Sequence, residues 1–293
     1  MQILVTGAFG NIGKFLISEL LKQGYCVKCF VLPSEKNRRI ERRNRKIKRI
    51  KVYYGDIRKK EDIEIAIKYC RAVIHLAFAS PEICQKNHSE ACKTNIEGTK
   101  NLIEAVKENS ENIKIIFPSS ASVYFYNLYK KTNKIKLLRY IEYTKHKLEC
   151  EKMIKLSSLN WCVLRIGAVL PTKFPILRNL LDIPYNAHFQ FVHVKDVITA
   201  LINAVKVKEA IKRILLIGGG KEFCMQYKDF VSNLFRIAGR KIPKDSDFTS
   251  RPYLTECFDT AESQKILKYQ KHSYKDFLRG MYYQKKKATT GIS

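Results

Sequence analysis

Tyr143 and Lys147 are the two residues whose types and spacing most directly suggest chemistry. On a helix, residues four apart share one face, so the phenol and the ammonium would be neighbours. A phenol with an ordinary pKa near ~10 is a poor base at neutral pH, but a nearby positive charge favours its phenolate. Tyr143 could then take a proton from an alcohol or return one to a carbonyl, while Ser120 holds the same oxygen by a hydrogen bond. A Tyr-x-x-x-Lys pair also occurs often by chance, so this prediction depends on the rest of the chain.

A glycine-rich turn at residues 6–13 suggests a place for a phosphate. The apolar run before it, 2–5, predicts a buried strand, and the run after it predicts a helix. Gly7 allows the tight turn, Gly10 lets backbone N–H groups approach a pyrophosphate, and Gly13 lets the helix pack close to the strand. The helix N-terminus adds unpaired N–H donors and a positive dipole end. The spacing is one residue off the usual dinucleotide fingerprint, and a glycine turn without function is the alternative.

The end of the second predicted strand, residues 27–32, bears on the type of dinucleotide. This end faces the adenosine ribose in such sites, and an acid there binds the 2′-hydroxyl of NAD. Here the run ends in Leu32, and no acid follows until Glu35. The neighbouring polar and basic side chains are Ser34, Lys36, Arg38 and Arg39. This pattern favours a 2′-phosphate, and therefore NADP over NAD, by a small margin. The alternative is that these residues form the exposed face of the next helix.

Two further polar residues are candidates for the cofactor site. Asp56 follows the strand predicted at 50–54, where a carboxylate would lie at the ligand crevice and could accept from the adenine amino group. It could instead cap the helix that starts near Glu61. Asn95 lies in the helix predicted at 89–108, where it either faces the sheet and fixes backbone groups near the cofactor or faces solvent.

The elements that must position these residues alternate between strands and helices. The strands are predicted at 2–5, 27–32, 50–54, 71–79, 113–117, 160–165 and 214–217. This alternation predicts an α/β fold with a doubly wound parallel sheet. His75 lies inside the fourth strand and is interpreted as a packed, structural residue. The predicted organisation is a dinucleotide-binding domain at 1–170 that is completed by about 190–220, a smaller C-terminal substrate lobe at 171–189 and 221–284, and a mobile basic tail at 285–293.

The composition limits the classes of function. The chain has 293 residues and a formal net charge of +28, from 55 Lys and Arg against 27 acids. Such a surface attracts polyanions, nucleic acid included, without specificity, and the alternative is a merely solvated surface. No run approaches the roughly 18 apolar residues of a membrane span. Because the first strand begins at once, we expect no signal peptide and a cytoplasmic protein. The nine cysteines have no paired metal-ligand spacing, so we expect reduced, mostly packed thiols and no metal site.

Taken together, these pieces resemble the short-chain dehydrogenase/reductase superfamily of the extended type, the group of NAD(P)-dependent sugar epimerases, dehydratases and reductases. The resemblance covers about residues 1 to 280 and implies a Rossmann fold. Its motifs lie at residues 6–13, 55–57, 75–77, 94–99, 119–124, 143–151, 164–167 and 191–197.

The resemblance also implies roles for individual residues. The catalytic trio would be Ser120, Tyr143 and Lys147. The cofactor would be lined by Gly7, Gly10, Asn11, Ile12, Gly13, Asp56, Ile57, Leu76, Ala77 and Asn95, together with Tyr143 and Lys147. By analogy a homodimer would form through a four-helix contact that includes the Tyr143 helix.

Departures from the family pattern bear on the substrate. Dehydratases of this group carry Thr-Asp-Glu where this chain has residues 120–122, Ser-Ala-Ser, so elimination of water is not expected. Nucleotide-sugar epimerases carry an Asn near Ala168 and an Arg near Phe189, both for the diphosphate, and both positions are apolar here. Arg251 could match a second phosphate-binding Arg, or lie on the surface. We therefore expect an oxidoreductase or epimerase acting on a hydroxyl or carbonyl of a small substrate, with a nucleotide sugar still possible. The competing hypothesis is a weakly catalytic NAD(P)-binding protein that binds RNA or senses redox state.

Overall fold

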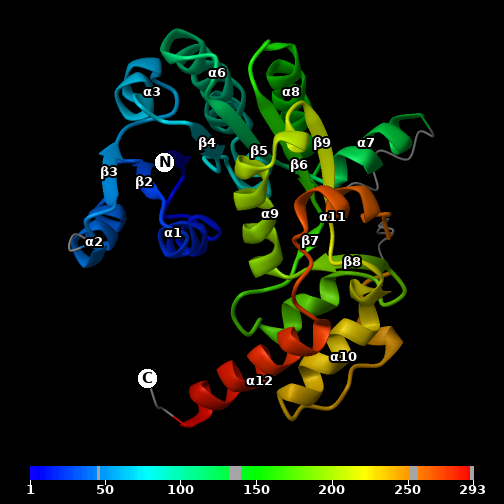
Figure 1. Ribbon diagram of the computed structural model, residues 1–293. Coiled ribbons are helices and arrows are strands. Elements are labelled where there is room, and N and C mark those ends of the chain that lie inside the picture. The colour runs from blue at the N-terminus through cyan, green and yellow to red at the C-terminus, as the bar shows by residue number, and fades with distance from the viewer. Residues whose placement is uncertain (45–46, 132–139, 251–256, 291–293) are drawn as a thin grey trace.

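The computed structural model describes residues 1–44, 47–131, 140–250 and 257–290. A seven-stranded sheet forms its centre, in the order β3-β2-β1-β4-β5-β6-β9 (Figure 1). All neighbouring strands in it are parallel. Its strands are β1 (Gln2–Thr6), β2 (Cys26–Val31), β3 (Ile50–Tyr54), β4 (Ala72–His75), β5 (Lys114–Ser120), β6 (Trp161–Ile166) and β9 (Arg213–Ile217). The chain leaves β1 toward one edge and returns at β4 toward the other, so a ligand crevice is expected between β1 and β4. This arrangement confirms the predicted α/β fold.

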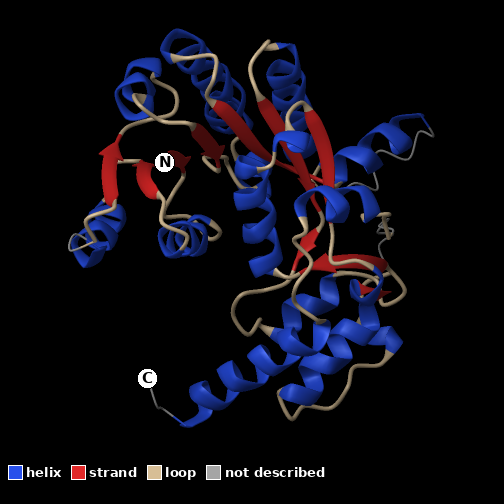
Figure 2. Cartoon of the chain, viewed as in Figure 1, coloured by secondary structure: helices blue, strands red, loops and turns tan. Residues whose placement is uncertain are grey.

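Helices cover both faces of the sheet (Figure 2). On one face, α1 (Gly13–Lys22) and α9 (Val194–Lys206) bury Leu16 and Leu201 against the strands. On the other, α3 (Lys60–Ile67), α6 (Gly98–Asn109) and α8 (Ile141–Leu156) bury Ile63, Leu102 and Ile154. The sheet is therefore buried on both sides, as its near-continuous apolar strands require. The other helices of this part of the chain are α2 (Glu35–Asn44), α4 (Pro81–Lys86), α5 (His88–Cys92), the π-helix η1 (Lys93–Glu97), α7 (Ser122–Lys131) and the 3₁₀ helix η4 (Lys208–Ala210).

A smaller lobe continues from the carboxyl ends of β6 and β9. Its three-stranded sheet has the order β10-β8-β7, formed by β7 (Ala168–Val169), β8 (His188–Val192) and β10 (Cys224–Gln226). Aromatic side chains fill its core, where the Phe191 and Phe230 rings lie 4.6 Å apart. Its helices are η3 (Leu177–Asp182), η5 (Lys221–Phe223), α10 (Tyr227–Ile237), η6 (Asp245–Asp247) and α12 (Tyr274–Thr290), while α11 (Ala261–Leu267) returns to pack on α9 and β9.

Three element boundaries differ from the sequence prediction. Strand β5 runs on to Ser120, so Ser119 and Ser120 belong to the strand instead of following it. The single helix expected at 89–108 is divided into α5, η1 and α6. Helix α12 continues past Tyr283 to Thr290, so 285–290 are helical, and the mobility of this end stays a prediction. Among the described residues, no helix is both long and apolar enough to cross a membrane.

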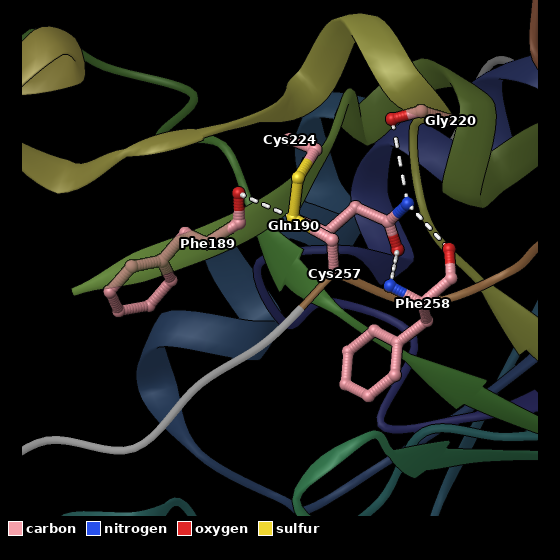
Figure 3. Close-up of a disulfide and its surroundings, with 6 residues drawn as sticks. All are labelled: Phe189, Gln190, Gly220, Cys224, Cys257 and Phe258. Carbon is pink, nitrogen blue, oxygen red and sulfur yellow. Dashed lines mark hydrogen bonds between the residues drawn. A yellow bond between two sulfur atoms is a disulfide. The ribbon is translucent and has the colours of Figure 1, made fainter.

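The expectation that all cysteines are reduced is wrong for one pair. Cys224 on β10 and Cys257 form a disulfide with their Cα atoms 5.8 Å apart (Figure 3). They are 33 residues apart in sequence and meet only because the chain returns to the small sheet after α10. No local spacing signals such a pair. Within the described residues the other seven cysteines are free thiols.

Candidate functional site

The glycine turn is built so tightly that side chains are excluded at two of its positions. Gly7 has a φ of +63°, and a Cβ there would lie 2.8 Å from the backbone nitrogen of Ala77 on the next strand end. A Cβ at Gly13 would collide with the backbone of Ala8. Helix α1 then starts at Gly13 with no side chain capping its first turn. The Lys14 and Phe15 N–H groups donate to the carbonyl oxygens of Gly10 and Ile12, at 3.4 and 3.1 Å. Phosphate binding at this helix start stays a prediction.

A cleft of about 540 Å³ opens beside this turn at the carboxyl ends of β1, β2, β3 and β4. Six of the predicted cofactor residues line it: Gly7, Gly10, Asp56, Ile57, Leu76 and Ala77. The other predicted residues do not line it: Asn11, Ile12, Gly13, Asn95, Ser120, Tyr143 and Lys147. Side chains that the sequence did not single out also line it, among them Phe9, Phe30, Arg58 and Phe78. Arg58 and Phe78 directly follow predicted motifs, and this position is the signal by which they could have been found.

Asp56 is held in the cleft by Arg58. The guanidinium Nη2 lies 2.6 Å from the carboxylate Oδ2, and the Arg58 Nη1 reaches Glu90 at 2.8 Å. Hydrogen bonds from Arg58 lower the pKa of Asp56, so the carboxylate stays an acceptor at neutral pH. The residue before α3 is Lys59, and no side chain caps that helix. Asp56 is therefore not the helix cap that was the alternative interpretation.

The cleft wall at the end of β2 lacks an acid. It is formed by Val31, Leu32, Lys36 and Asn37, and Leu32 is 55% exposed. The Asn37 amide donates to the Leu32 carbonyl oxygen at 2.9 Å, which fixes the turn into α2. Among these wall residues, Lys36 of α2 is the one with a positive charge.

Tyr143 lies in the first turn of α8 and Lys147 one turn later, and both contact Phe78. The Tyr143 and Phe78 rings meet edge to face with centroids 5.6 Å apart. The Lys147 Nζ lies 3.5 Å from the Phe78 centroid, 5.6 Å from the Tyr143 centroid, and donates to the Pro118 carbonyl oxygen at 2.7 Å. Phe78 thus lines the cleft and contacts both residues of the Tyr–Lys pair.

Burial sets the protonation of both groups. It raises the pKa of Tyr143 above its usual value of 10.0, so the phenol is neutral at neutral pH. It lowers the pKa of Lys147 to about 7, because a buried ammonium loses its hydration. In this state Tyr143 is an acid that can give a proton. It becomes a base only when positive charge is brought close to it.

Ser120 stands at the end of β5 and is bonded to Ser122. Both the backbone N–H and the hydroxyl of Ser122 lie within reach of the Ser120 Oγ, at 3.2 and 2.9 Å. Ser122 also contacts the Thr144 hydroxyl at 2.9 Å, and Thr144 donates to the Tyr140 carbonyl oxygen. This chain of hydroxyls links the end of β5 to the start of the helix that carries Tyr143.

Asn95 is fully buried and does not face solvent. Its Oδ1 accepts from the Ala79 N–H at 2.7 Å, which holds the loop after β4 against the π-helix. Asn95 therefore fixes backbone next to the cleft without lining it. His75 is also buried, and both ring nitrogens are bonded, to Thr6 at 2.8 Å and Thr99 at 3.1 Å. Burial lowers the pKa of His75 to about 3, so it is a neutral packing residue, as interpreted from the sequence.

An ion pair attaches α8, the helix of the Tyr–Lys pair, to the sheet. Glu151 on α8 is 3% exposed and accepts from Arg165 on β6, with Nη2–Oε2 at 2.6 Å and Nε–Oε1 at 3.0 Å. Ser119 on β5 donates to the same carboxylate at 2.5 Å. The carboxylate ties α8 to two neighbouring strands, and this role was not predicted for Glu151.

Within the described residues, one group of three side chains has the proximity of metal ligands: His88, Glu142 and His146. Asn95 donates to the Nδ1 of His146 at 3.1 Å, so the ring proton lies on Nε2. That buried nitrogen has no hydrogen-bond partner in the described structure. It therefore presents a proton where a metal would need a lone pair, and we do not assign a metal site there.

This glycine turn, the crevice between β1 and β4 and the Tyr–Lys helix define the extended short-chain dehydrogenase/reductase superfamily, as the sequence indicated. Residues 4–172, more than half of the chain, match the model of the 3-beta hydroxysteroid dehydrogenase/isomerase family. The chain belongs to this family.

Curated relatives match a shorter segment. The chain is 33% identical over 121 residues to the bovine sterol-4-alpha-carboxylate 3-dehydrogenase, decarboxylating, covering 41% of this chain and 31% of the relative. It is 30% identical over 122 residues to the dihydroflavonol 4-reductase of Zea mays, covering 41% of this chain and 34% of the relative. The matches thus span about a third of each relative's length.

Solved structures are similar over the whole chain. A UDP-glucose 4-epimerase of Thermotoga maritima with UDP-glucose has a TM-score of 0.75 and 22% identity, covering 99% of this chain and all of that one. A dTDP-glucose 4,6-dehydratase double mutant of Streptomyces venezuelae, solved with NAD bound, has a TM-score of 0.78 and 17% identity, covering 99% and 98%. At these identities the likeness concerns the fold.

Proposed function

We propose that the chain moves a hydride between NADP(H) and a hydroxyl or carbonyl carbon of a small substrate, with Tyr143 transferring the proton. The observation that carries the proposal is that one cleft is lined both by the glycine turn and by Phe78, which contacts both Tyr143 and Lys147. Structure neighbours crystallised with NAD support a nicotinamide dinucleotide in this cleft. The cofactor would be held by Gly7, Gly10, Asn11, Ile12 and Gly13 at its phosphates and by Asp56, Ile57, Leu76 and Ala77 around its adenosine and ribose.

The bound nicotinamide would supply the hydride acceptor or donor, and the chain's residues would handle the proton. Tyr143 is neutral in the free protein, so it suits donation of a proton to a carbonyl oxygen. Lys147, with its pKa lowered to about 7, titrates at physiological pH, and its charge helps Tyr143 to lose the proton. Ser120 would bind the same substrate oxygen, with Ser122 fixing its hydroxyl.

We infer a substrate of lower polarity than a nucleotide sugar. Phe189, where related epimerases carry an arginine, is 6% exposed and stacks on Phe191 with ring centroids 5.3 Å apart. Position 189 therefore offers no positive charge to a diphosphate. The sterol and flavonol names of the relatives agree with this inference. The UDP-sugars of the structure neighbours favour a sugar nucleotide as the second candidate, with epimerisation by oxidation, rotation and reduction at the same trio.

The decisive experiment is turnover of a panel of sterols, dihydroflavonols, simple ketones and UDP-sugars, followed by the absorbance of NADPH. Tyr143→Phe should abolish turnover of any substrate found while cofactor binding is retained. A Tyr143→Phe protein with full activity would contradict the mechanism. Tyr140→Phe is the matched control, because Tyr140 has no lysine one turn later.

The preference for NADP over NAD is part of the same proposal. Leu32 directly follows β2, at the place where a carboxylate would bind the ribose 2′-hydroxyl of NAD. Lys36 lines the same wall of the cleft. Lys36→Ala should weaken NADPH binding by about tenfold, the value of one charged hydrogen bond, and leave NADH binding unchanged. Arg43→Ala on the same helix is the control, since it does not line the cleft. If Lys36→Ala weakens the binding of NADPH and NADH equally, the preference for NADP over NAD is contradicted.

A further inference from the structure

The disulfide between Cys224 and Cys257 lies on the lobe side of the molecule, away from the glycine turn. Cys224 is the first residue of β10, where it is opposite Gln190 of β8. Cys257 is exposed and Cys224 is half-buried, so a dissolved thiol can reach the bond. The position of this bond is independent of the cofactor site.

The residue after Cys257 connects the disulfide to the end of β5. The Phe258 ring lies 6.0 Å from that of Tyr124 and 5.5 Å from that of Phe125, both on α7, which begins at Ser122. Tyr124, Cys257, Phe258 and Asp259 line one cavity of about 440 Å³. The disulfide therefore fixes one wall of a cavity that α7 also lines through Tyr124.

Gln190 gives this wall a second attachment (Figure 3). Its side-chain amide donates to the Phe258 carbonyl oxygen at 3.0 Å, and its Oε1 accepts from the Phe258 N–H at 3.4 Å. The Cys257 sulfur lies 3.9 Å from the Phe189 carbonyl oxygen, a contact in which only the reduced thiol has a proton to donate (Figure 3). In the oxidised protein, Phe258 is thus held both by hydrogen bonds to Gln190 and by the disulfide of the residue before it.

Most free thiols of the described residues are poorly placed for thiol–disulfide exchange. Five of the seven free thiols are buried, and burial raises the pKa of Cys29, Cys150 and Cys162 to about 12 and that of Cys70 to about 11. The thiolate is the reactive form, so these thiols exchange slowly at neutral pH.

We propose that Cys224–Cys257 is a redox-controlled tie that sets the rigidity of the cavity wall at Phe258. A dithiol reductant opens it by thiol–disulfide exchange: a thiolate attacks one sulfur, the S–S bond breaks, and a second thiolate resolves the mixed disulfide. The two cysteines gain two electrons and two protons, and the reductant becomes a disulfide. Glutathione disulfide drives the reverse reaction. This inference goes beyond the proposed function, and neither turnover nor cofactor is needed to test it.

The first test counts thiols in the full chain. Protein purified without reductant is unfolded and labelled with a thiol reagent, before and after dithiothreitol. Seven reactive thiols are expected before reduction and nine after it, from the nine cysteines of the chain. Nine thiols that persist after the folded protein is exposed to glutathione disulfide would overturn the proposal.

The second test asks whether the tie controls the wall. Hydrogen exchange at the Phe258 amide should be several-fold faster in the reduced wild type and in Cys257→Ser than in the oxidised wild type, while exchange in β1 and α1 is unchanged. Cys92→Ser, at a half-buried free thiol, is the matched control and should behave as the wild type. If Cys257→Ser does not fold, the chemically reduced wild type gives the same comparison. Equal exchange in both redox states would refute a controlling role.

Discussion

At the residue scale, the pKa of a single buried amine makes a thermodynamic prediction. Burial lowers the pKa of Lys147 from 10.5 to about 7. Between these values the unfolded chain binds a proton that the folded chain does not, so stability rises with pH. The contribution to the free energy of unfolding increases by up to about 1.4 kcal/mol per pH unit.

Lys147→Met removes this titration. Urea unfolding of both proteins between pH about 7 and about 8, below the pKa near ~8.5 of exposed thiols, gives the difference. The free energy of unfolding of the wild type should climb relative to that of the variant as pH rises. Parallel curves would mean that Lys147 is hydrated and charged in the folded protein.

The same pKa values predict how turnover depends on pH. Because burial raises the pKa of Tyr143, the phenol holds its proton at neutral pH and must lose it before it can accept one from an alcohol. Alcohol oxidation should therefore speed up with rising pH, while carbonyl reduction should not. Initial rates in both directions, measured as kcat/KM for the substrate found in the panel, check this. An oxidation rate that falls with pH would contradict Tyr143 as the base.

At the element scale, the glycine turn owes its function to backbone geometry. Gly7→Ala places a Cβ 2.8 Å from the Ala77 nitrogen in a backbone of φ +63° and should abolish NADPH binding as well as lower stability. Gly24→Ala is the matched control, because Gly24 has a φ of +87° but open space around it. It should cost only the left-handed strain, about 1 kcal/mol, and leave binding intact. Thermal unfolding and NADPH titration of both variants separate the two effects.

The ion pair under α8 is the second element-scale feature. Glu151 and Arg165 are both largely buried, so removing one partner leaves an unpaired charge in the core. Glu151→Gln should lower the free energy of unfolding by about 3–5 kcal/mol, whereas replacing Glu149, exposed on the same helix, by Gln should change little. Urea unfolding measures both. A loss below about 1 kcal/mol for Glu151→Gln would mean that α8 is not braced by this pair.

The sequence predicted elements better than it predicted contacts. The strands of the seven-stranded sheet were placed within a few residues, because buried parallel strands are continuous apolar runs between glycine and polar turns. The three short strands of the lobe, β7, β8 and β10, were not predicted. The split of the helix at 89–108 was missed: Asn95 lies in the π-helix and its side chain contacts Ala79, and local spacing carries no sign of such a tertiary contact. Arg58, Phe78 and Glu151 were missed for a related reason: their roles depend on partners that meet them only in the folded chain.

At the scale of the whole molecule, the net charge of +28 stands apart from the site. Part of it lies on α2, which carries Arg38, Arg39, Arg42 and Arg43. We expect binding of duplex DNA to fall by orders of magnitude as salt rises from about 0.05 to about 0.2 M, because it depends on released counterions. NADPH binding should persist over that range. Salt-resistant DNA binding, measured by fluorescence anisotropy, would instead indicate a specific nucleic-acid role.

The two halves of the seven-stranded sheet support different parts of the molecule. The half that contains β1 to β4 forms the glycine turn and the cleft, and its geometry was readable from motifs. The half that contains β6 and β9 leads into the lobe, whose packing among aromatic side chains and the Cys224–Cys257 disulfide bring together residues far apart in sequence. Substrate choice is therefore the property that the sequence alone left most open.

A crystal structure of the protein with NADP⁺ tests the central claim most directly. The account predicts the diphosphate at the turn of Gly7 to Gly13, the 2′-phosphate near Lys36, and the nicotinamide beside Tyr143. It also predicts that Lys147 leaves the Pro118 carbonyl oxygen for the ribose hydroxyls. A dinucleotide bound elsewhere, or a nicotinamide that does not reach Tyr143, would contradict it.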